Sequence, residues 1–203
     1  MFKVGDKIVY PMHGAGVIEK IEERAILDEK KTYYIIKMPG EVKVMVPTEK
    51  ADDVGMRNII DVDTAGKVIN VLEQDCTEMS DKWNKRYRDN VEKLKSGNIF
   101  EVADIVRNLT FKQKDKGLST TEKKMLLNAK QILVSELVLA EDKEKDFIEN
   151  LVDNKINESY LWHPGVSHGG NDKRCKSWIF PPRIAGLLAQ LSALVHTLSS
   201  YKD

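Results

Sequence analysis

The sequence contains few cysteines and no long apolar run. Its two cysteines, Cys76 and Cys175, lie far apart, which excludes a small domain held together by several disulfides. No stretch approaches the ~18 consecutive apolar residues of a membrane-spanning helix, and the opening residues MFKVGDK include no apolar signal region. We therefore expect a protein of the reducing cytoplasm that makes no membrane contact.

The chain also has no excess of charge of either sign. Lysine and arginine total 32, as do aspartate and glutamate, among 203 residues, so the formal net charge is zero. A protein that binds nucleic acid through its overall positive field is excluded, and any such contact must depend on a local cluster of cations. Hydrophobic residues make up 41% of the chain, which is enough for the core of one or two domains.

Catalytic and ligand-binding motifs are missing as well. The stretch Ala65-Gly66-Lys67-Val68 is not a phosphate-binding loop, because no serine or threonine follows the lysine and the earlier glycine of that motif is absent. His13 lies in a glycine-containing turn without a second histidine or cysteine nearby, so we interpret it as a turn residue and not as a metal ligand. With no pairing of nucleophile and base, we expect no enzyme activity, no cofactor and no small-molecule substrate.

Residues 1–60 alternate between apolar and polar side chains, as β-strands do. Such segments cover 7–10, 17–24, 32–38 and 42–46, and the residues between them are typical of turns. Short strands joined by tight turns predict a small, strongly bent antiparallel barrel. Tyr10, Tyr33 and Tyr34 allow two interpretations: a cage for a methylated lysine, or ordinary filling of the barrel core, which is the commoner arrangement.

Residues 61–156 change to the helical period. Apolar positions predict a short helix around 68–72, a helix within 80–97, one after an Asn98 cap, one after a capping box of Ser119 and Glu122, and a last one near 141–156. Short connections predict antiparallel neighbours in a compact bundle. The sequence therefore predicts an α+β protein, with the barrel over 1–60 followed by an all-α domain over 61–156.

The helix expected within 80–97 combines one tryptophan with a group of cations. Trp83 begins a stripe that continues at helical spacing, and such a stripe usually faces a core. Trp83 is nevertheless the first residue of the stripe, where a side chain can extend beyond the end of a core. A large apolar side chain can wedge between base pairs from the minor groove, and cations bind phosphate without reading sequence. The stripe is Trp83, Tyr87, Val91 and Leu94, and the cations are Lys82, Lys85, Arg86 and Arg88.

Three segments carry a resemblance to a known family. They are FKVGDKIVYPMHGAG, WNKRYRDNVEKLKSG and LSTTEKKMLLNAKQILVSELVLA, and together they resemble the CarD/CdnL family of bacterial transcription regulators over residues 1–156. The barrel alone also resembles the polymerase-interacting domain of transcription-repair coupling factor, but that protein continues into a helicase motor that this sequence does not contain. The resemblance implies a Tudor-like barrel that docks on the β subunit of RNA polymerase. It also implies a helical domain at the upstream edge of the transcription bubble.

The resemblance also implies roles for particular residues. A family tryptophan wedges into the minor groove at the bubble edge and slows its collapse, and this residue matches Trp83. The matching DNA-contacting cations are Lys85, Arg86 and Arg88, and the matching polymerase-binding residues are Arg24, Ile26 and Met45. Some relatives have arginine at the position of Met45, so we expect polymerase binding here to depend more on apolar contact. The DNA contact is expected to be mostly independent of sequence.

A second interpretation is a protein-interaction scaffold whose barrel binds another protein and whose helices never contact DNA. Exposure of Trp83 beside Lys85, Arg86 and Arg88 would favour the DNA-binding regulator, whereas a buried Trp83 would favour the scaffold.

The sequence changes character over residues 157–203, where the resemblance ends. Residues 183–199 predict a helix with one apolar face after Pro181-Pro182, either as an interaction helix or packed on the bundle. An extension with no selected role is a further alternative. A metal site from His163, His168 and Cys175 fits no standard zinc spacing, so we expect no metal.

Overall fold

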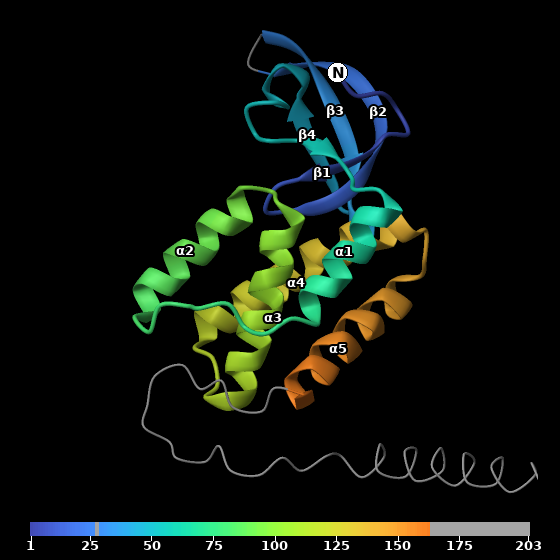
Figure 1. Ribbon diagram of the computed structural model, residues 1–203. Coiled ribbons are helices and arrows are strands. Elements are labelled where there is room, and N and C mark those ends of the chain that lie inside the picture. The colour runs from blue at the N-terminus through green and yellow to red at the C-terminus, as the bar shows by residue number, and fades with distance from the viewer. Residues whose placement is uncertain (27–28, 163–203) are drawn as a thin grey trace, which may run out of the picture. The chain divides into compact units, whose positions relative to one another are not determined.

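The computed structural model describes residues 1–26 and 29–162, and within these an antiparallel sheet is followed by five helices (Figure 1). These described residues belong to one compact unit. The fold class predicted from the sequence, a β domain followed by an α domain, is confirmed. The predicted helix at 183–199 and the alternative metal site at His163, His168 and Cys175 lie outside the described residues. The division of the chain at residues 60 and 156 remains a prediction.

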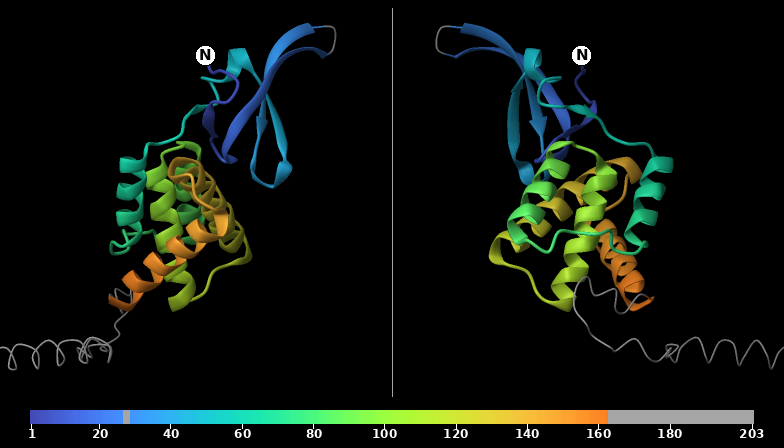
Figure 2. Two further views of the ribbon diagram at one scale, coloured as in Figure 1. Left: turned by 90° about the vertical axis from the view of Figure 1, so that its right-hand side faces the viewer. Right: turned by 60° about the vertical axis from the view of Figure 1, so that its left-hand side comes forward.

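Five strands form the sheet. They are β1 (Lys7–Tyr10), β2 (Gly14–Ile26), β3 (Glu29–Lys37), β4 (Lys43–Pro47) and β5 (Arg57–Asn58). Every pairing is antiparallel, and the order is β4-β3-β2-β1-β5, so the described strands form an open sheet with β4 and β5 at its edges. Short 3₁₀ turns, Pro39–Glu41 and Thr48–Lys50, flank β4. The long hairpin of β2 and β3 curves along its length (Figure 2).

The two faces of the sheet have different environments. A shift of register between Ile18 and Lys20 in β2 changes which residues face inward along the strand. The inner face carries the small core of the sheet, whose buried members include Ile8, Ile18, Tyr34, Ile36 and Val46. Because successive residues of a strand point to opposite faces, residues such as Ile35 belong to the outer face.

The tyrosines considered for an aromatic cage do not converge. Tyr34 belongs to the inner core, and its hydroxyl accepts a hydrogen bond from the backbone N–H of Phe2. Tyr33 is the neighbouring residue on β3 and therefore faces the other side of the sheet. Tyr10 stacks on His13, with ring centroids 4.6 Å apart. The cage interpretation is wrong for these three residues, because Tyr33 and Tyr34 cannot line one mouth.

The helices are α1 (Val62–Leu72), α2 (Trp83–Lys95), α3 (Ile99–Asp115), α4 (Thr120–Glu141) and α5 (Lys145–Trp162). Their starts follow from the sequence, since the side chains of Asp61 and Asn98 cap α1 and α3, and Ser119 and Glu122 form the capping box of α4. One apolar core joins all five helices, and its fully buried members include Leu72, Ile105, Leu109, Leu133, Leu137 and Ile148.

Candidate nucleic-acid and polymerase interface

The apolar stripe of α2 emerges gradually from the core. Leu94, near the C-terminal end of the helix, is buried, and Val91 and Tyr87 are half-buried at the edge of the helical core. Trp83, the first residue of α2, retains 51% of its surface exposed. The sequence alone left open whether this tryptophan is packed, and the structure places it in solvent. An indole exposed to this extent at a helix end is a large apolar surface that the protein covers only in part.

Tyr87 supports Trp83 from one side. Their ring centroids lie 6.2 Å apart with an angle of 62° between the rings, an edge-to-face contact. Tyr87 in turn packs against the helical core. The indole is therefore held at one edge by a half-buried ring while much of its surface is open. This arrangement restricts the orientation of Trp83 and leaves a rigid apolar surface for a ligand.

Exposed cations surround the same end of α2. Lys82 precedes the helix, and Lys85 and Arg88 are exposed within its first turns. At 100° per residue, Lys85 and Arg88 lie on the side of α2 opposite to the core-facing stripe. The first turn contains no acidic residue, and no side chain caps its N–H groups. Both the cations and the positive end of the helix dipole favour phosphate here.

Arg86 does not belong to this surface, and the prediction that it contacts DNA is corrected. Its side chain is only 6% exposed. Its Nε and Nη2 donate to Oε1 of Glu122 over 2.8 and 2.6 Å, and its Nη1 donates to the backbone carbonyls of Ser80 and Asp81 over 2.6 and 3.2 Å. Every nitrogen of the guanidinium is thus engaged inside the protein, which leaves none for a phosphate.

The contacts of Arg86 give it a positioning role instead. Ser80 and Asp81 form the end of the connection that leads into α2, so Arg86 anchors the backbone just before Trp83. Glu122 belongs to the capping box at the start of α4 and also accepts hydrogen bonds from Ser119. Burial alone would raise the pKa of the Glu122 carboxyl, but the hydrogen bonds from Arg86 and Ser119 bring it below its ordinary value.

The ion pair of Arg86 and Glu122 also brings further cations to this region. Lys123 and Lys124 follow Glu122 directly and are exposed in the first turns of α4. Sequence reasoning missed both, because they lie some forty residues after Trp83 in the chain and nothing local links the two segments. The capping box and the buried arginine were the available signals, but their pairing is a tertiary contact.

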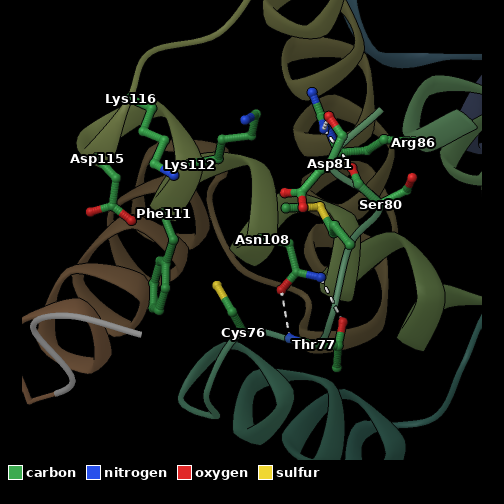
Figure 3. A pocket seen from close by; sticks show the side chains of 11 residues that line it. Cys76, Thr77, Ser80, Asp81, Arg86, Asn108, Phe111, Lys112, Asp115 and Lys116 are labelled. Carbon is green, nitrogen blue, oxygen red and sulfur yellow. Dashed lines mark hydrogen bonds between the residues drawn. The ribbon is translucent and has the colours of Figure 1, made fainter. Parts of the chain in front are cut away.

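A small pocket lies beside the connection between α1 and α2 (Figure 3). Its lining includes Cys76, Thr77, Asn108 and Phe111, and Asn108 is bonded to both the backbone N–H and the hydroxyl of Thr77. Burial raises the pKa of the Cys76 thiol to about 11, so this cysteine is a protonated thiol at neutral pH and a poor nucleophile. The pocket offers no pairing of nucleophile and base.

The sheet presents the residues predicted to bind polymerase. Met45 pairs with Ile35 and Arg24 pairs with Lys31, so both lie on the outer face of the sheet, on β4 and β2. Met45 is 37% exposed, and Arg24 is exposed and bonded to Glu22. Ile26 is the last residue of β2 and pairs with Glu29. Arg24 and Met45 are thus brought to one face, but they lie on different strands and do not touch one another in any described contact.

Comparison with known proteins identifies the family. Residues 2–60 match the model of the CarD-like/TRCF RID domain, and residues 67–153 match that of the CarD C-terminal domain. A protein named "Putative transcription factor YdeB" from Bacillus subtilis (strain 168) is 43% identical over 138 residues, which are 68% of this chain and 90% of that protein. The chain belongs to the CarD family. Membership in the CarD family indicates transcription regulation through interaction with RNA polymerase, and the RID domain is the part associated with that interaction.

Two kinds of feature are absent from the part of the chain that the structure describes. No helix among residues 1–26 and 29–162 is long and apolar enough to cross a membrane. The same residues contain no group of three or more histidine, cysteine, aspartate or glutamate side chains that could hold a metal ion.

Proposed function

We propose that this CarD family protein binds the β subunit of RNA polymerase through its sheet and stabilises the promoter open complex by inserting Trp83 into the minor groove at the upstream edge of the bubble. The observation that carries the proposal is the exposed indole of Trp83 at the start of a helix whose first turns also carry the exposed cations Lys82, Lys85 and Arg88. The protein would act in the cytoplasm, on the nucleoid, as a regulator and not as an enzyme.

The chemistry of the α2 end suits a bubble edge better than intact duplex. Inserting an apolar side chain between stacked base pairs costs a few kcal/mol per step, and a step next to melted DNA is already partly unstacked. Lysine and arginine at the same end contact phosphates without reading sequence. The combination selects a DNA conformation and not a base sequence, which fits a factor that acts at many promoters.

The proposed effect is a shift of equilibrium. A protein that binds only the melted state lowers the free energy of that state relative to the closed complex. An advantage of ~1.4 kcal/mol would change the ratio of open to closed complexes about tenfold. Docking on polymerase supplies a high effective concentration near the bubble, so the affinity for free DNA can be weak.

The outer face of the sheet is the proposed polymerase-binding surface. Arg24, Met45 and the end of β2 at Ile26 lie on or next to it, and β4, which carries Met45, is an edge strand of the described sheet. Edge strands offer backbone groups for pairing with another chain, and Met45 adds an adaptable apolar contact. We propose that apolar contact at Met45 contributes more to this docking than a charged contact would.

The lifetime of the open complex tests the proposal. Trp83→Ala should bind polymerase β as the wild type does but shorten the open-complex lifetime after challenge with a competitor, by about tenfold if the wedge supplies ~1.4 kcal/mol. Leu127→Ala is the matched control, since Leu127 is a large apolar side chain exposed on α4, and it should leave the lifetime unchanged. A wild-type lifetime for Trp83→Ala would refute the wedge. Loss of polymerase binding in that variant would show instead that Trp83 belongs to a protein interface.

A further inference from the structure

One buried carboxylate connects the sheet to the helices. Glu136 of α4 is 0% exposed. Its Oε1 and Oε2 accept hydrogen bonds from Nη1 and Nη2 of Arg57, a β5 residue, over 2.6 and 2.9 Å. Oε1 also accepts from the backbone N–H of Ile60 over 3.1 Å. Arg57 thus forms a two-point ion pair whose planar geometry permits only one orientation of strand β5 against α4.

Arg57 has a further partner that leads to the DNA-facing helix. Its Nε and Nη2 donate to the backbone carbonyl of Gly97 over 3.0 and 2.7 Å. Gly97 is the turn residue between α2 and α3, with φ +68°, and a Cβ added to it would lie 3.2 Å from Cγ of Pro11. Pro11 follows β1 in the turn before β2. Arg57 therefore contacts the turn that follows α2 through its side chain, and Pro11 lies next to the same turn.

Other hydrogen bonds between the sheet and α4 do not pair two charged groups. The hydroxyl of Ser135 accepts from the backbone N–H of Ala15 over 2.8 Å, and Lys7 donates to the carbonyl of Leu139 over 2.9 Å. If either hydrogen bond were broken, a water molecule or a small shift of the chain could supply a new partner for its donor and acceptor. The pair of Arg57 and Glu136 cannot be replaced in this way, because moving them apart would leave a buried carboxylate with only the backbone N–H of Ile60 as its partner.

We propose that Arg57 and Glu136 are positioning residues that hold the polymerase-binding sheet at a set orientation relative to α2, so that docking on polymerase presents Trp83 to the bubble edge. This inference rests on the proposed function. Neither residue lies at the exposed indole or among the residues assigned to polymerase binding. Their contribution is geometric: a tethered wedge that can rotate freely spends only part of its time aimed at the DNA, and its effective concentration there falls.

An ion pair with a fully buried carboxylate is a reasonable device for such a purpose, although the Arg57 side chain keeps 32% of its surface exposed. Replacing a buried pair by apolar side chains is often neutral for stability, whereas breaking it by removing one partner is costly. Such pairs are therefore poorly explained by stability alone, and specifying one arrangement is an established use. An experiment can use this contrast to separate orientation from stability. Removing one member of the pair and replacing both members should differ in their effect on stability, but both changes remove the hydrogen-bonded geometry.

The test compares two variants of the full-length chain. One carries Arg57→Met alone, and the other, the double variant, carries both Arg57→Met and Glu136→Met. Three quantities are measured: affinity for polymerase β, open-complex lifetime, and the distance distribution between spin labels at Glu49→Cys near β4 and Asn150→Cys on α5. The labelled chains carry Cys76→Ala and Cys175→Ser. Arg57→Met should bind polymerase within twofold of the wild type, broaden the distance distribution and shorten the lifetime. The double variant should regain thermal stability but keep the broad distribution and the short lifetime.

The outcomes separate this inference from the proposed function. A single narrow distance in Arg57→Met, or a wild-type lifetime in the double variant, would overturn the positioning role. Trp83→Ala runs in parallel. If Trp83→Ala keeps a wild-type lifetime while Arg57→Met still broadens the distances, the wedge fails and the orienting pair stands. If Trp83→Ala shortens the lifetime and both Arg57 variants match the wild type, the wedge stands and the positioning role fails.

Discussion

Arg86 and Trp83 lie three residues apart on one helix and have opposite environments. The guanidinium is buried and bonded to Glu122, Ser80 and Asp81, whereas the indole is half exposed. The two are linked nonetheless, because Arg86 anchors the backbone that leads into Trp83. At this scale the proposed wedge depends on a residue whose guanidinium is bonded inside the protein.

Removing the Arg86 side chain should therefore destabilise the fold. Arg86→Met leaves Glu122 buried without its partner and should lower the free energy of unfolding by ~3–5 kcal/mol. Arg88→Met on the exposed side of the same helix is the control and should change it by less than ~0.5 kcal/mol. Denaturant unfolding measures both. Equal stability of the two variants would mean that the buried ion pair contributes nothing measurable.

The same ion pair predicts a dependence of stability on pH. The pKa of the Glu122 carboxyl is lowered from its ordinary value of 4.5 in the folded protein. Its contribution is therefore present above pH 4.5 and is lost as the pH falls through the folded pKa. Thermal unfolding between neutral and acid pH should show a smaller loss of stability for Glu122→Gln than for the wild type, because the other carboxylates are common to both. Parallel curves would contradict the assignment.

At the scale of elements, local sequence signals were sufficient to predict most of the helices and strands. The caps at Asn98 and Ser119 and the alternating pattern of the strands predicted the elements where the structure has them, because caps and periodicity act within a few residues. The two-residue strand β5 was missed, since Arg57-Asn58 is too short for any periodicity. Arg86 was misassigned because charged residues on helices are usually solvated, and its partner is distant in sequence.

The turn between α2 and α3 offers a test at this scale. Gly97→Ala should destabilise the protein, because an L-residue at φ +68° costs ~1–2 kcal/mol and the new Cβ would press on Pro11. Gly117→Ala is the matched control, with φ +77° and no atom within 4 Å of the added Cβ. Gly97→Ala should therefore have the lower melting temperature. The reverse order would show that the contact with Pro11 is easily relaxed.

For the whole molecule, net neutrality coexists with a proposed DNA contact. The formal charge is zero, so long-range attraction to DNA is weak and the tether to polymerase supplies the encounter. The residues proposed to bind polymerase and the proposed wedge belong to different elements, and no local sequence feature specifies their mutual orientation. That part of the site could not be predicted from sequence, because it depends on contacts such as that of Arg57 with Glu136.

Salt should affect the proposed activity through a few cations only. Lys85→Ala with Arg88→Ala removes two phosphate contacts and should reduce the salt dependence of the open-complex lifetime, by a slope of about 0.9 per lost contact with duplex. Lys95→Ala, exposed at the other end of α2, should leave the slope unchanged. Identical slopes for all three proteins would mean that these cations do not contact phosphate.

Site-specific crosslinking tests the wedge most directly. A photoreactive phenylalanine derivative replaces Trp83 in the full-length chain, and the crosslinked bases are mapped on a promoter bound to polymerase. The account predicts crosslinks to bases at the upstream edge of the bubble that appear only when the complex is open. Crosslinks to polymerase alone, or equal crosslinking to closed and open complexes, would contradict it.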